Sequence, residues 1–102
     1  MDEKDGKEKS RKIAMRIEPA LEGGVYTNVF SLLNSPHEFI LDFGLLLPTS
    51  NSVRIGARII LNPLIAKQLA IALTEGVRNY EAKFGEIKID RVSHNLGSQI
   101  LN

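Results

Sequence analysis

One long helical pattern near the end of the chain limits the folds that are open to it. Asn62-Pro63 predicts a helix start, because Asn can accept from free backbone amides and Pro is tolerated at the first helical position. Gly85 can take the left-handed conformation that ends a helix, so the helix should run to about Phe84. At about 100° per residue, six apolar side chains form a stripe that we expect to face a sheet: Ala66, Leu69, Leu73, Val77, Tyr80 and Phe84.

The residues before this helix have the patterns of strands. Ile13, Met15 and Ile17 occupy alternate positions and predict a first strand that ends at Glu18-Pro19. Further strands are predicted at residues 25–33, 37–44 and 53–61, which are rich in β-branched and aromatic residues or alternate in polarity. The predicted fold class is α+β: an antiparallel β-meander of about four strands followed by one long amphipathic helix, with residues 85–90 as a candidate short C-terminal strand.

Asp42-Phe43-Gly44 spells the magnesium-binding triplet of protein kinases. The chain is too short for two kinase lobes and carries no GxGxxG loop, so the triplet is interpreted as part of a strand. Gly44 is predicted to mark a bulge or a bend at which regular pairing ends.

A turn at Asn34-Ser35-Pro36 predicts that the two central strands pair antiparallel. A register with Phe30 opposite Phe39 would gather the aromatic side chains on one face. The same register places Asp42 on the other face, opposite Thr27.

Two arginines, Arg54 and Arg58, are predicted to lie on the same side of the sheet as Asp42 and Glu38. An arginine–carboxylate ladder is the simpler interpretation, and an anion site made by the two arginines is the alternative.

Composition excludes several classes of protein. Thirteen Lys and Arg against twelve Asp and Glu leave a net charge of +1, far from the basic balance expected of a nucleic-acid-binding domain. Without cysteine, the chain has no disulfide, thiolate nucleophile or cysteine-ligated zinc. No secretory leader or membrane-length apolar run is evident, so a cytoplasmic protein is expected, with no membrane partner.

The predicted domain organisation is a disordered charged tail at residues 1–10, a single α+β domain at 11–91 and a loose C-terminal tail at 92–102. Four strands make a sheet about 19 Å wide, whereas a helix with its side chains is about 10–12 Å across. One helix therefore cannot cover one face, and a homodimer is predicted. The candidate interface has two parts. Three leucines either prolong a strand or meet a neighbouring chain: Leu45, Leu46 and Leu47. Two apolar residues lie on the polar side of the helix: Leu64 and Ile71.

The order of several short motifs resembles a known family. A Tyr-Thr-Asn strand, a Ser-Pro turn, Asp-Phe-Gly, an Arg-containing strand ending in Asn-Pro, and a helix with Tyr-Glu and Phe-Gly at its end follow one another over about residues 11–89. This order is similar to that of the small bacterial and archaeal family called domain of unknown function 3467. The resemblance implies a layout and carries over no reaction, ligand or catalytic residue.

No catalytic, metal or cofactor site is predicted. His37 lies beside a proline at a strand edge, where a turn residue is the more common interpretation than a catalytic base. The favoured function is a non-enzymatic protein-interaction or structural module that could also bind another protein by strand addition. The alternative is a nucleic-acid-binding accessory protein with a basic sheet face made by Arg54, Arg58, Lys88 and Arg91.

Overall fold

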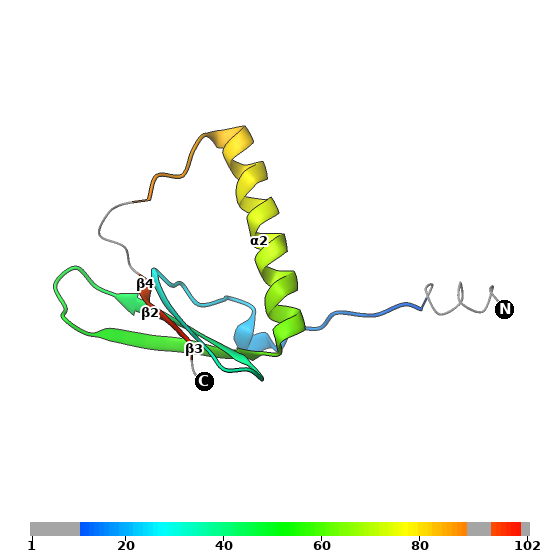
Figure 1. Ribbon diagram of the computed structural model, residues 1–102, viewed down its shortest axis with the longest axis horizontal. Helices are drawn as coiled ribbons and strands as arrows, with labels where there is room; N and C mark the ends of the chain where they lie inside the picture. Colours follow the sequence, from blue (N-terminus) through cyan, green and yellow to red (C-terminus); the bar gives the residue numbers. More distant parts are fainter. Residues whose placement is uncertain (1–10, 90–94, 101–102) are drawn as a thin grey trace.

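The computed structural model describes residues 11–89 and 95–100 and has the α+β architecture predicted from the sequence (Figure 1). Three antiparallel strands are followed by one long helix, and a fourth strand returns to the sheet. In chain order the elements are η1 (Pro19–Leu21), β1 (Val29–Asn34), β2 (Phe39–Leu46), β3 (Val53–Leu61), α2 (Pro63–Phe84) and β4 (Asn95–Ile100).

The strand order in the sheet is β3-β2-β1-β4. β1–β2 and β2–β3 are hairpins, whose short connections require antiparallel pairing. β4 pairs with β1 in parallel, which requires a long crossover, and α2 lies within that connection.

The place of the predicted first strand is taken by β4. Residues 11–18 form no strand, and Ile13, Met15 and Ile17 are 75%, 95% and 56% exposed, so this prediction is wrong. A strand at the start of the meander would have paired with the free edge of β1, and β4 occupies that edge.

The C-terminal part of the chain also differs from the prediction. Residues 95–100, expected to belong to a loose tail, form β4, whereas residues 85–89 of the candidate last strand form no strand. The length of the connection explains this difference, since a chain leaving the far end of α2 needs several residues to return to the sheet. The predicted tail at residues 1–10 lies outside the described residues.

The predicted register of the β1–β2 hairpin is wrong by four positions: Phe39 pairs with Asn34 and not with Phe30, and Asp42 pairs with Ser31 and not with Thr27. Phe30 pairs with Phe43, and pairing continues to Asn34 and Phe39, so that four residues remain in the turn. The Ser35 amide donates to the Glu38 carbonyl over 2.9 Å. Because four is an even number, each side chain stays on its predicted face, and the turn is centred two residues later in the chain than predicted.

β2 and β3 lose their regular register at Gly44, as predicted. Phe43 pairs with Ala57 but Gly44 pairs with Ile55, so β3 carries one extra residue at this point. Beyond the bulge the faces of β3 are exchanged, and Arg54 lies opposite Leu45. The prediction that Arg54 and Arg58 share one face is therefore wrong.

α2 begins and ends where the sequence predicts. The Asn62 side chain accepts from the Ile65 amide over 2.8 Å, and Gly85 has φ +101° and donates its amide to the Glu81 carbonyl. The helix leaves the sheet at an angle, however, and its C-terminal half stands away from the strands (Figure 1). The expected packing of the whole apolar stripe on the sheet is not realised within this chain.

Candidate interaction surface

The apolar stripe of α2 is the most extensive exposed apolar feature of the helix. Leu73, Tyr80 and Phe84 are 58%, 51% and 70% exposed. Leu69 and Val77, which also belong to the stripe, are 37% and 42% exposed. The sequence places these residues on one side of the helix, and the angle at which α2 leaves the sheet exposes them.

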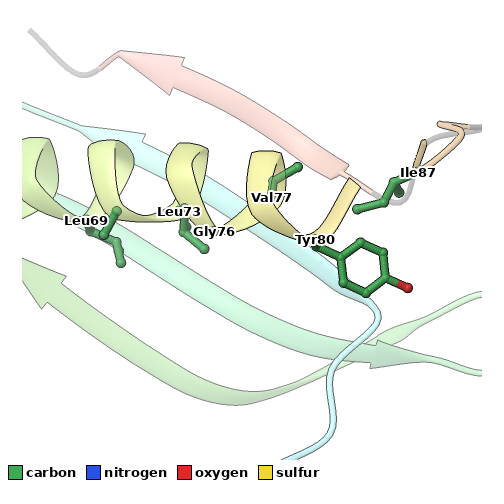
Figure 2. A pocket seen from close by; sticks show the side chains of 7 residues that line it. Leu69, Leu73, Gly76, Val77, Tyr80 and Ile87 are labelled. Atoms are coloured by element: carbon green, nitrogen blue, oxygen red, sulfur yellow. The ribbon is translucent and has the colours of Figure 1, made fainter. Parts of the chain in front are cut away.

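The segment after α2 adds an apolar wall to this stripe. Ile87 lies near Val77 and Tyr80 at one end of an open groove of about 380 Å³ that also includes Leu73 and Gly76 (Figure 2). The Ile87 amide donates to a Glu81 carboxylate oxygen over 2.9 Å, which ties this segment to the last turns of the helix. The sequence pattern missed this contribution, because residues 85–90 were interpreted as a strand.

A second apolar cavity lies where the first half of α2 meets the sheet. It has a volume of about 220 Å³ and is lined by Leu32, Phe39, Leu41 and Leu61 from the strands and by Ala66, Leu69, Ala70 and Leu73 from the helix. The helix and sheet diverge from this point (Figure 1), and Leu69 and Leu73 line both the cavity and the groove. It is large enough for an apolar side chain from outside.

The bulge at Gly44 is held by two polar residues that precede β1. The Gly44 carbonyl accepts from the Asn28 amide over 3.0 Å, and the Thr27 hydroxyl lies 2.7 Å from the same oxygen. The Asn28 side chain accepts from the Leu46 amide and donates to the Leu46 carbonyl, both over 2.9 Å. Asn28 thus uses its side-chain amide in place of a backbone pair and continues the ladder past the bulge.

Asp42 is buried in the sheet and paired with Arg58 on the neighbouring strand. Arg58 Nε and Nη2 donate to the two Asp42 carboxylate oxygens over 2.7 and 2.8 Å, in a bidentate pair. The hydrogen bonds from Arg58 hold the pKa of the Asp42 carboxyl below its usual value, against the opposing effect of desolvation. The same pairing raises the pKa of the Arg58 guanidinium. For this pair, the arginine–carboxylate interpretation is the one the structure supports.

A comparison with known protein families identifies the family to which the chain belongs. The family model described as "Protein of unknown function (DUF3467)" matches residues 1–89. The chain belongs to this family. No curated protein and no solved structure matches it significantly.

The predicted interface residues of this DUF3467 chain lie in two separate places. Leu45 and Leu46 belong to β2, so two of the three leucines prolong the strand, and Leu47 follows it with 52% of its surface exposed. Leu64 and Ile71 lie on α2 with 63% and 53% exposed. They project from the side of the helix opposite the stripe.

The predicted basic residues are not gathered into one face by the described part of the chain. Arg58 is engaged by Asp42, and Arg54 lies beyond the bulge opposite Leu45. Lys88 is exposed after the helix, and Arg91 lies outside the described residues.

His37 is exposed in the β1–β2 turn, where its amide donates to the Ser35 hydroxyl over 3.2 Å. Among the residues that the structure describes, no group of three or more His, Asp or Glu side chains could hold a metal ion. Within the same residues, no helix is both long enough and apolar enough to cross a bilayer.

Proposed function

We propose that this DUF3467 protein is a homodimeric, non-enzymatic protein-interaction or structural module. The observation that carries the proposal is the near absence of a core: in the segment 11–89, the buried residues are Val29, Asp42 and Gly44. Ordering a residue costs about 1–2 kcal/mol of backbone entropy, which burial of apolar surface must offset. A chain that leaves its helix stripe exposed gains little of that burial alone, and a second copy supplies it.

The polar groups of the sheet support a structural role. Both Asp42 carboxylate oxygens accept from Arg58, and Asn28 is engaged by both backbone groups of Leu46. The hydrogen bonds of these side chains hold β1, β2 and β3 together. That use favours a scaffold over a catalytic site.

A strand-addition partner is consistent with the same scaffold. β3 is an edge strand of nine residues in the order β3-β2-β1-β4, and an extended peptide could pair with its outer backbone groups. Such a peptide would bind to the assembled dimer and would not replace the second copy of the chain.

Sedimentation velocity over a range of about 0.1–100 μM protein tests the proposal. We expect a dimer at the upper concentrations, and a compact, folded monomer throughout the range would overturn it. The competing nucleic-acid function is tested by anisotropy of labelled oligonucleotides, because phosphate binding weakens steeply between about 50 and 200 mM salt. Arg54→Glu is the variant of choice there, since Arg58 is already paired with Asp42. Salt-sensitive binding that Arg54→Glu abolishes would favour the nucleic-acid function.

A further inference from the structure

We infer that the dimer forms by antiparallel packing of α2 against α2 of a second copy, with the helices crossing at Gly76 and Val77 and each Phe84 entering the other copy's helix–sheet cavity. This inference rests on the proposed dimer and names its surface. Three observations support it: the symmetry of the stripe, the open space at Gly76, and the cavity.

The stripe reads almost the same from both ends. Leu73 precedes Gly76 by three positions and Tyr80 follows Val77 by three, while Leu69 and Phe84 lie seven positions outside the same centre. An antiparallel pair with its twofold axis at this centre places Leu73 level with Tyr80 of the second copy. It likewise places Leu69 level with Phe84 of the second copy, so apolar residues meet apolar residues along the helix. An interface between identical surfaces requires this kind of self-complementarity.

Gly76 lies at the proposed crossing point. A Cβ built at Gly76 would have nothing within 4 Å, so this side of the helix is open. Helices pack with axes about 8–10 Å apart, and small residues at the contact allow the shorter distances. Glycine is unfavourable in the middle of a helix by about 0.5–1 kcal/mol relative to alanine, and close approach of a second helix gives it a use.

The cavity between helix and sheet can receive the most exposed residue of the stripe. Phe84 is 70% exposed, and in the antiparallel arrangement it reaches the height of Leu69, which lines the cavity. The cavity of about 220 Å³ exceeds the roughly 150 Å³ of an apolar protein cavity that accepts benzene. The twofold axis makes this contact twice, once in each copy.

The area of the contact requires these two insertions. A helix of 22 residues is about 33 Å long, and a strip about 10 Å wide along it covers about 330 Å², or about 660 Å² for two copies. Stable interfaces bury about 1,200–2,000 Å² in total. The helix pair alone falls short of that range, so the contacts of each helix end with the other copy's sheet must belong to the interface.

Cysteine cross-linking tests the crossing point, and any disulfide must come from the introduced residue, since the chain has no cysteine of its own. Gly76→Cys places a small thiol where nothing lies within 4 Å, and we expect it to form a disulfide-linked dimer under mild oxidation. Glu75→Cys, on the opposite side of the helix, is the matched control and should cross-link at least tenfold more slowly. Equal rates for the two variants would overturn the inference.

The orientation is tested by mixing two single variants. Leu73→Cys and Tyr80→Cys should cross-link to each other in the antiparallel pair and poorly to themselves. Preferential self-linking of each variant would indicate a parallel pair and overturn the inference.

Phe84→Ala tests the insertion into the cavity. Because a buried aromatic anchor commonly dominates an interface, we expect the dimer dissociation constant to rise at least tenfold. Leu64→Ala, on the other side of α2, should change it less than twofold. If the protein sediments as a dimer that none of the stripe variants affects, the inference fails while the proposed dimer survives; a monomer at all concentrations defeats both.

Discussion

At the scale of single residues, Gly44 shows how one position shapes the sheet. A Cβ built there would lie 2.7 Å from Val53 Cγ1 and 2.9 Å from the Arg54 carbonyl oxygen. The backbone oxygen cannot move without breaking the β2–β3 bulge. The glycine of the Asp-Phe-Gly triplet is therefore required by packing, with no reference to a metal.

Gly44→Ala should destabilise the protein by about 1–3 kcal/mol, the range for forcing an extra methyl into a packed site. Urea unfolding measured at one fixed protein concentration checks this value. Gly23→Ala is the matched control, because a Cβ there would have nothing within 4 Å. A loss of stability equal in the two variants would contradict the steric argument.

At the scale of elements, the Asp42–Arg58 pair joins β2 to β3 next to the bulge. Folding lowers the pKa of Asp42 below its ordinary value of 3.8, so the folded state binds this proton less readily than the unfolded state. The resulting stabilisation is present in full above the unfolded pKa and is lost as pH falls through the lower pKa of the folded state. Arg58 stays protonated over this range, because the hydrogen bonds to Asp42 raise its already high pKa further.

Asp42→Asn should therefore lower the denaturation midpoint at pH 7, and the difference from the wild type should shrink as the pH falls below about 4. Urea titrations at a series of pH values check this. Glu38→Gln removes an exposed carboxylate just before the same strand and serves as the control. A difference between wild type and Asp42→Asn that stays constant with pH would argue against the ion pair as its cause.

At the scale of the whole molecule, the exposed helix couples folding to association. If a second copy covers the stripe, unfolding also separates the two copies, and stability depends on protein concentration. Each tenfold increase in concentration should add about 1.4 kcal/mol per mole of dimer.

Thermal unfolding at about 1, 10 and 100 μM checks this dependence. We expect the unfolding midpoint to rise with concentration. Lysozyme or another monomeric protein under the same conditions provides the control. A midpoint independent of concentration, together with a cooperative transition, would mean that one chain is stable alone.

The sequence by itself determined the local features whose causes lie within a few residues. The Asn62 cap, the stop at Gly85, the hairpin turn at Ser35 and the bulge at Gly44 were predictable because each depends on local backbone chemistry. Tertiary structure alone decided which strand lies beside β1, the exchange of faces at Arg54 and the angle at which α2 leaves the sheet. Those outcomes depend on contacts between distant segments. Alternating apolar residues such as Ile13 and Met15 have the period of a strand but do not specify the strand with which they would pair.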